Sequence, residues 1–124
     1  HVCLRRFDPA EAWRLIREQR VTHLCAAPTV LIALVNAPEA PTEPLGRPWT
    51  VATAAAPPSP TIIRQVEALG AEVIHVYGLT EVYGPYTVCA WQPRWDALPP
   101  EERARLKVRQ GVGYLIADDA RVVD

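Results

Sequence analysis

The sequence predicts an α/β fold, a mostly parallel sheet with helices on both faces, followed by a short strand-rich and helical extension. Over residues 1–77, strand-like apolar runs alternate with segments whose apolar residues recur at helical spacing. These runs are too apolar to face water, as is typical of parallel strands packed between helices. A proline also stands at the start of each expected helix, where its fixed φ angle is favourable. We therefore expect a single domain in which residues 78–124 form the extension.

The alternating region begins with a short strand at residues 1–6 and a helix that starts at Asp8-Pro9. Aspartate is a favourable cap, and the acid three residues later gives a signal close to a capping box, so the helix is expected to start here. We expect it to run to about Gln19. Another helix follows Ser59-Pro60, with Gly70 as its expected stop. The other expected elements are strands at residues 22–26, 49–55 and 72–77, a helix from Pro28 and a surface loop at 36–48.

The extension combines strands, a loop and one helix. We expect a strand at residues 86–92, a loop after it, and a helix from Pro100 to about Gln110. This helix has acids in its first turn and bases further along, an order that suits the helix dipole. Residues 111–124 are expected to form two short strands joined by a turn at Asp118-Asp119.

Composition and charge argue against several classes of function. The chain has 124 residues and a net charge of −1 with no basic block, which argues against nucleic-acid binding. No apolar run approaches the roughly 20 residues that a membrane-spanning helix needs, and no signal peptide is visible. Cys3, Cys25 and Cys89 form no CxxC pair, so we expect no zinc site, and buried, reduced thiols in a cytoplasmic protein. Methionine is absent and both ends fall in apolar runs, so we expect a piece of a larger domain.

The stretch HVYGLTEVYGP, residues 75–85, ends the fourth expected strand with an aromatic ring, a hydroxyl and a carboxylate close together. Ligands of open parallel sheets bind beyond the carboxyl ends of the strands. The third strand ends in small residues at 54–58, so a flat base fits between this segment and the ring of Tyr77. Thr80 is then placed to donate to a phosphate oxygen, and Glu81 to hold Mg²⁺ together with the phosphates.

A purely structural interpretation of the same stretch stays open. With Gly78 in a left-handed conformation and Thr80 capping the next segment, it would be an ordinary turn at the end of a strand. His75 is placed equally well for the core and for a site, whereas His23 lies in an apolar strand and is expected in the core. The sequence contains no GxSxG elbow, no GxxxxGK phosphate loop and no GxGxxG motif.

Several motifs occur in an order that points to one family. HVYGLTEVYGP is followed by TVCAWQPRWDALPPEERARLKVRQGV, and upstream lie the FDP helix start, VTHLCAAPTVL and TAAAPP. Together they resemble the adenylate-forming, AMP-binding superfamily, and within it acyl-CoA synthetases of the short- to medium-chain, acyl-activating type. The resemblance covers essentially the whole chain. It implies an internal piece of the large N-terminal domain of an enzyme that joins a carboxylic acid to coenzyme A, through an acyl-AMP formed from ATP and Mg²⁺.

The resemblance also implies residue roles. Tyr77 stacks on adenine while Gly78 leaves room for the base. Thr80 contacts the phosphates and Glu81 ligates magnesium, so these two residues are the implied catalytic pair. The other implied contacts are His75 and Val76 at the adenine edge, Ala55, Ala56 and Pro57 on the opposite wall, and Cys25, Ala26, Ala27, Val82, Tyr83, Gly84 and Pro85 around the acid substrate.

One departure from the family pattern concerns Ala54-Ala55, where relatives of this type usually have two glycines. Compared with glycine, alanine adds a methyl group and is less free to adopt positive φ. If either methyl group touches adenine, the affinity for ATP falls, unless a shift of the backbone makes room for the methyl group. The family's phosphate loop, ribose-binding aspartate and catalytic lysine are not in these residues, so we expect the segment alone to be inactive. Two alternatives stay open: an adenylating protein with a different acceptor, and a non-catalytic, degenerate α/β homologue.

Overall fold

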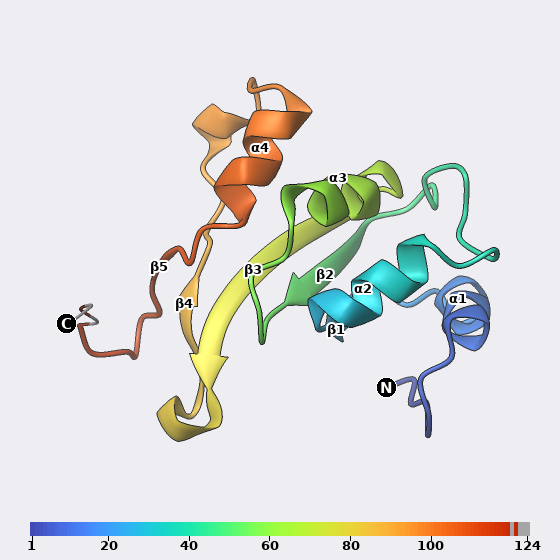
Figure 1. The fold of residues 1–124 in the computed structure, drawn as a ribbon, viewed down its shortest axis with the longest axis horizontal. Helices are drawn as coiled ribbons and strands as arrows, with labels where there is room; N and C mark the ends of the chain where they lie inside the picture. The colour runs from blue at the N-terminus through green and yellow to red at the C-terminus, as the bar shows by residue number, and fades with distance from the viewer. Residues whose placement is uncertain (120, 122–124) are drawn as a thin grey trace.

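The computed structural model describes residues 1–119 and residue 121 of the chain. Within these residues, five strands form one mixed sheet in the order β1-β2-β3-β4-β5 (Figure 1). This architecture confirms the predicted α/β class. The strands are β1 (His23–Ala26), β2 (Trp49–Thr53), β3 (Ala71–Leu79), β4 (Gly84–Val88) and β5 (Val112–Gly113). The helices are α1 (Pro9–Glu18), α2 (Pro28–Val35), α3 (Pro60–Ala68) and α4 (Pro100–Lys107), with short 3₁₀ helices at η1 (Thr80–Val82) and η2 (Pro93–Trp95).

The predicted helix starts and the predicted helix stop are confirmed. Asp8 caps α1 by accepting a hydrogen bond from the amide of Glu11 at 2.9 Å. Ser59 caps α3 in the same way, from the amide of Ile62 at 3.3 Å. Gly70 follows the end of α3 with φ +83°, a conformation that favours glycine. Local side-chain chemistry therefore sets where these helices begin and end.

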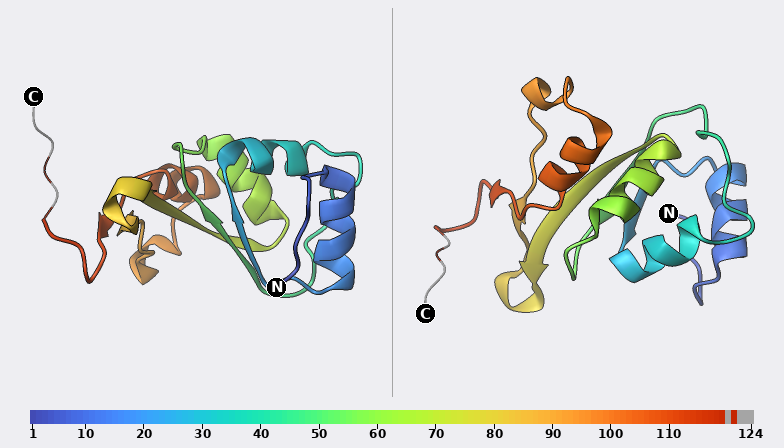
Figure 2. Two further views of the ribbon diagram at one scale, coloured as in Figure 1. Left: turned by 90° about the horizontal axis from the view of Figure 1, so that it is seen from below. Right: turned by 45° about the horizontal axis from the view of Figure 1, so that its top comes forward.

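β1, β2 and β3 form the parallel half of the sheet, with α2 and α3 as the crossovers between them. Because the strands are added in one direction, crossovers of the same hand place both helices on one face. Figure 2 shows α2 and α3 side by side there, with α1 next to α2. On this face, the side chains of β2 and those of β3 up to His75 are buried, among them Val51 and Val73, whereas the opposite face is half-buried or exposed. The second layer of the expected helices on both faces is thus not formed by the described residues.

The hydrophobic core lies between these helices and the sheet. Trp13 of α1 and Trp49 of β2 pack edge to face, with ring centroids 6.1 Å apart. Both indoles are buried, and both donate to backbone carbonyls, Trp13 to Leu34 at 2.9 Å and Trp49 to Leu69 at 3.2 Å. Burial of the rings therefore leaves no ring N–H without a partner. The predicted apolar faces of α2 and α3 contribute Leu31, Leu34, Ile62, Ile63 and Val66 to this core.

β3 belongs to both the parallel and the antiparallel half of the sheet. It pairs in parallel with β2 up to His75 and antiparallel with β4 from Val76 onward, with a register shift between Tyr77 and Gly78. β4 in turn pairs antiparallel with β5. The sheet is therefore mixed, with two parallel and two antiparallel pairings, where the sequence predicts a mostly parallel one. The connection from β3 to β4 is only η1 and its cap, which is too short for a parallel crossover.

The N-terminal residues and the edge strand differ from the sequence predictions. Residues 1–6 form no strand, and all of them are exposed. His23 and Cys25 are exposed as well, because they point to the open face of the edge strand β1, and Cys3 is exposed in the N-terminal segment. Of the three cysteines only Cys89 is buried, and burial raises the pKa of its thiol. The prediction of buried thiols is thus wrong for two of the three cysteines.

The C-terminal part of the extension is described up to residue 119 and at residue 121. One of the two strands predicted for residues 111–124 is present as β5, and the second includes residues 120 and 122–124, which lie outside the described residues.

Within the part of the chain that the structure describes, no helix has both the length and the apolarity needed to cross a bilayer.

A buried ion pair fixes the extension to the alternating region. Lys107 of α4 binds Glu67 of α3, and the two side chains are only 8% and 14% exposed. The ammonium group of Lys107 also lies 4.7 Å from the centre of the Trp91 ring. A second pair between the same helices, Arg64 to Glu101 at 2.8 Å, is exposed to solvent. Loss of one partner is therefore costlier in the first pair, because the remaining charge has little contact with water.

Lys107→Met tests the buried pair. We expect this change to lower the free energy of unfolding by about 3 kcal/mol, because Glu67 keeps its charge in a buried position. Arg64→Met, the matched control in the exposed pair, should cost less than about 1 kcal/mol. Combining Lys107→Met with Glu67→Leu should recover most of the loss, since an apolar pair leaves no unpaired charge. Urea denaturation of the intact protein measures all three, and equal losses in the two single variants would contradict the prediction.

Candidate functional site

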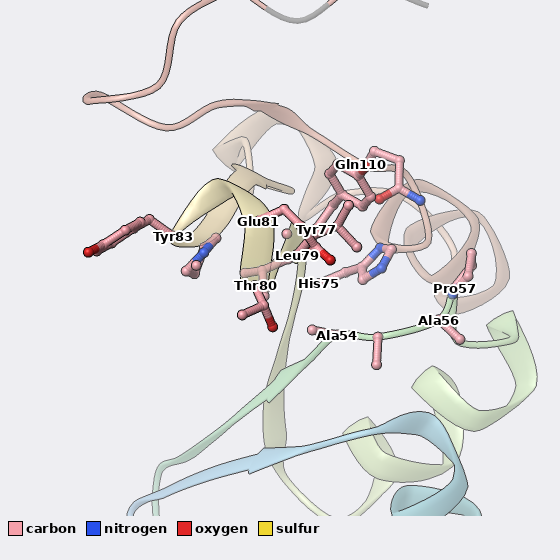
Figure 3. Close-up of a pocket in the computed structure, with 15 residues that line it drawn as sticks. Ala54, Ala56, Pro57, His75, Tyr77, Leu79, Thr80, Glu81, Tyr83 and Gln110 are labelled. Atoms are coloured by element: carbon pink, nitrogen blue, oxygen red, sulfur yellow. The ribbon is translucent and has the colours of Figure 1, made fainter.

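The carboxyl ends of β2 and β3 open into a cavity of about 1010 Å³ (Figure 3). This is the edge at which open parallel sheets bind their ligands. Three segments form the cavity: the loop after β2, the end of β3 with the turn that follows it, and the residues after α4. All residues predicted to contact a nucleotide lie in it, as does Glu81. The lining residues are 54–57, 75–81, 83–85 and 110.

The loop after β2 forms one wall of the cavity. Ala54 is half-buried, and the residues from Ala55 to Pro57 are exposed. Ala55 has φ +78°, a left-handed conformation that costs a residue with a β-carbon about 1 kcal/mol. Pro58 is buried behind the loop, and Ser59 caps α3, so the far end of the loop is fixed. Alanine therefore occupies a backbone conformation in which glycine is favoured, on the surface of the cavity itself.

His75 and Tyr77 of β3 form the facing wall. The side chain of His75 is only 2% exposed, and its Nδ1 lies 3.1 Å from the carbonyl oxygen of Arg109. Because a carbonyl oxygen can only accept, Nδ1 is the donor, and Nε2 is the acceptor when the ring is neutral. Tyr77 lies two residues further on the same strand, with 43% of its surface exposed at the cavity. The wall thus combines the flat aromatic surface of Tyr77 with a histidine ring that a backbone hydrogen bond holds in place.

The turn after β3 brings Thr80 and Glu81 to the cavity, and Gly78 makes this turn possible. A β-carbon at Gly78 would lie 1.9 Å from the carbonyl oxygen of Gly84, so only glycine permits β3 and β4 to approach here. Gly78 has no positive φ, and the side chain of Thr80 does not cap η1. The structural interpretation, a left-handed turn at Gly78 capped by Thr80, is therefore wrong. The chain reverses instead at Tyr83 and Gly84, which have φ +67° and +122°.

Glu81 is the only carboxylate that lines the cavity among the residues the structure describes. It is exposed, and the described part of the chain contains no group of three side chains that could hold a metal ion. A single carboxylate is too little for a metal site made of protein alone. It fits Mg²⁺, which typically takes one or two carboxylates and completes its shell with waters and substrate phosphates. The exposed hydroxyl of Thr80 lies next to it in the chain.

The residues predicted around the acid substrate are not gathered in one place. Residues 83–85 line the same cavity as the nucleotide motif, and Val82 belongs to the same turn but does not line the cavity. Residues 25–27 line a second cavity, against α1 and the N-terminal segment. The sheet order explains this separation, because β2 lies between β1 and β3.

Gln110 is a cavity residue that sequence reasoning missed. The sequence places it only at the end of a helix, and no motif surrounds it. It reaches the cavity because α4 packs on α3 and β3, which are distant contacts in the sequence. No local signal points to such a residue.

Comparison with known proteins decides the family. The family model described as AMP-binding enzyme matches residues 1–124, which is the whole chain. The chain belongs to the AMP-binding enzyme family. This result confirms the resemblance that the motif order indicates.

Named relatives of this AMP-binding chain are ligases that use coenzyme A. The acetate/butyrate–CoA ligase AAE7, peroxisomal, of Arabidopsis thaliana is 48% identical over 124 residues, covering 99% of this chain and 22% of that protein. The acetate–CoA ligase CCL3 of Humulus lupulus is 46% identical over 125 residues, with 100% and 22% coverage. The crystal structure of the N-terminal domain of FACL13 from Mycobacterium tuberculosis matches with a TM-score of 0.72 and 27% identity, over 90% of this chain and 26% of that one. The AMP-binding chain thus spans about a fifth of the length of these curated relatives and has the fold of part of such an N-terminal domain.

Ala55→Gly tests whether the wall of the AMP-binding cavity is strained. We expect this change to raise the free energy of unfolding by about 1 kcal/mol, because glycine adopts φ +78° without the clash of a β-carbon. The same substitution inside α2, Ala33→Gly, should lower the free energy of unfolding by about 1 kcal/mol, since glycine weakens a helix interior. Urea denaturation of the intact protein compares the two. Destabilisation by both changes would show that Ala55 carries no strain.

Proposed function

We propose that the intact protein is an AMP-forming acyl-CoA synthetase. In this reaction a carboxylic acid attacks the α-phosphorus of ATP, pyrophosphate leaves, and the thiol of coenzyme A then displaces AMP from the acyl-AMP. One observation carries the proposal: Tyr77, Thr80 and Glu81 share a single cavity with the small-residue wall at 54–57. These are the residue types that a base, a phosphate group and a metal ion require, and they occur in a chain of the AMP-binding enzyme family.

The adenine base of ATP is proposed to lie between Tyr77 and the wall at 54–57. The half-exposed ring of Tyr77 offers a flat surface for stacking, and the facing side chains are small enough to let the base approach. His75 and the backbone of Val76 border the same space and would meet the edge of the base. The carbonyl of Arg109 holds the His75 ring in one orientation, so its contact with the base would need little rearrangement.

The triphosphate is proposed to lie at Thr80 and Glu81. The hydroxyl of Thr80 would donate to a phosphate oxygen, and the carboxylate of Glu81 would hold Mg²⁺ jointly with the phosphates. When bound, the metal ion offsets phosphate charge, which lets a second anion approach. Residues 83–85 border the same cavity and would form part of the surroundings of the acid. Other walls of the site would come from parts of the protein beyond this chain, which spans about a fifth of its relatives' length.

The acid is proposed to be a fatty or related acid of the short kind for which the relatives are named, with coenzyme A as the acceptor. An adenylating protein with a different acceptor would exchange pyrophosphate into ATP but form no CoA thioester. A degenerate homologue would do neither. Assay of the intact protein with a panel of short acids, with and without coenzyme A, separates the three.

A cytoplasmic location is also proposed, and fluorescence microscopy of the tagged protein would distinguish it from the peroxisome, for which one relative is named.

Glu81→Gln tests the metal role in the intact protein. Acid-dependent exchange of pyrophosphate into ATP should fall roughly a hundredfold, because the amide removes the charge that holds the cation beside the phosphates. Glu72→Gln, at an exposed position of β3, the strand that precedes the turn with Glu81, is the matched control and should leave exchange unchanged. Exchange measured over a range of Mg²⁺ concentrations gives the result. Wild-type exchange in Glu81→Gln would refute the metal role.

Tyr77→Ala tests the stacking surface. The KM for ATP should rise roughly tenfold, since loss of an aromatic ring stacked on a base costs about 1–3 kcal/mol. Tyr77→Phe keeps the ring and should behave like the wild-type protein. Initial rates at varied ATP with saturating acid measure both variants. A KM for ATP that does not change in Tyr77→Ala would count against stacking.

A further inference from the structure

The backbone around Gln110 is held in place on both sides. The carbonyl of Arg109 accepts a hydrogen bond from Nδ1 of His75 at 3.1 Å, and the carbonyl of Gln110 accepts one from Oγ1 of Thr87 at 2.5 Å. Gly111 follows with φ +85°, and a β-carbon there would lie 2.0 Å from a carbonyl oxygen of β4. Three successive residues are therefore fixed against β3 and β4. The position from which the Gln110 side chain starts is thus well defined.

The side chain of Gln110 lines the cavity at the same end as His75 and Tyr77. Figure 3 draws Gln110, His75 and Tyr77 in the same part of this cavity. The sheet register accounts for this placement, because Tyr77 pairs with Thr87, whose hydroxyl binds the backbone of Gln110. The side chain is exposed, and within the described residues no hydrogen bond engages its amide. The neighbouring carbonyl of Arg109 binds His75, so Gln110 lies at the His75 end of the cavity, where the base is proposed to bind.

We propose that Gln110 contacts the edge of the nucleobase and gives the site a preference for adenine, an inference that rests on the ATP site proposed above. A primary amide presents an acceptor and a donor side by side. This pattern matches the amino group and the neighbouring ring nitrogen of adenine, as in the contacts that Asn and Gln make to adenine in DNA. A 6-oxopurine presents two acceptors at these positions, so one of the two hydrogen bonds is lost.

The acid substrate is a poorer partner for this amide. Its carboxylate has to reach the phosphates, which the proposed site places at Thr80 and Glu81, whereas Gln110 stands beside His75. The fixed backbone also favours recognition of a defined edge, because little freedom is lost when a preorganised side chain binds. Gln110 is therefore assigned to base selectivity.

Gln110→Ala in the intact protein, assayed with ATP and with ITP, tests the assignment. We expect kcat/KM for ATP to fall roughly tenfold and that for ITP to change less than about threefold, so that the preference for ATP shrinks. Gln110→Glu keeps the size of the side chain but removes the amide donor. Its carboxylate still accepts from the amino group of adenine and has no donor for the two acceptors of ITP, so both values should fall while the preference for ATP persists, unlike in Gln110→Ala. Gln65→Ala, an exposed position on α3, is the matched control and should leave both values unchanged.

A second variant, at Thr87, tests the positioning of Gln110. Thr87→Val removes the donor that holds the Gln110 carbonyl, and it should lower the ATP preference by a smaller factor, as expected of a positioning residue. A purely structural role of Gln110 would lower turnover of both nucleotides equally, and that result would overturn the proposal. If the preference is unchanged while Tyr77→Ala still raises the KM for ATP, the base-selectivity role fails and the ATP site stands. If the wild-type protein turns over neither nucleotide with any short acid, both proposals fail together.

Discussion

The approach of β3 to β4 at Gly78 is the contact on which the geometry of the cavity depends. A carbonyl oxygen of the neighbouring strand occupies the space where a β-carbon would stand. This contact lets β3 carry parallel pairing on its first half and antiparallel pairing on its second. The turn with Thr80 and Glu81 is consequently folded back beside Tyr77, and the chain that follows returns along the sheet. From there α4 reaches α3, and the residues after α4 complete the cavity.

Features encoded by neighbouring residues could be predicted from the sequence. The side chains of Asp8 and Ser59 cap α1 and α3 through local hydrogen bonds, and both helices begin where the sequence predicts. The strand–helix alternation likewise predicts the parallel half of the sheet. The direction of β4 and the single helical layer depend instead on how strands are arranged in space. An apolar strand does not reveal whether its second face is covered by this chain or by another part of the protein.

In the candidate site, too, features set by neighbouring residues could be predicted, whereas features set by packing between distant segments could not. Tyr77, Thr80 and Glu81 are adjacent in the chain, so their convergence with the loop after β2 follows from the rule for parallel sheets. For Gly78, the sequence marks a glycine but does not show whether its φ freedom or its missing β-carbon is needed. Only the partner strand distinguishes these two. Gln110 reaches the cavity through the packing of α4, which no local pattern in the sequence marks. Residues 25–27 lie across β2 from this cavity, and their role around the acid stays a prediction.

The left-handed alanine bears on the entropy of ligand binding. A glycine at position 55 would exchange among several backbone conformations, and a ligand would have to select one of them. Alanine has fewer alternatives, and the two prolines at 57 and 58 restrict the loop further. The ordering entropy of this loop is therefore lost when the chain folds rather than when a ligand binds. The methyl group that raises the energy of the native backbone thus also sets the shape of the wall before a ligand arrives.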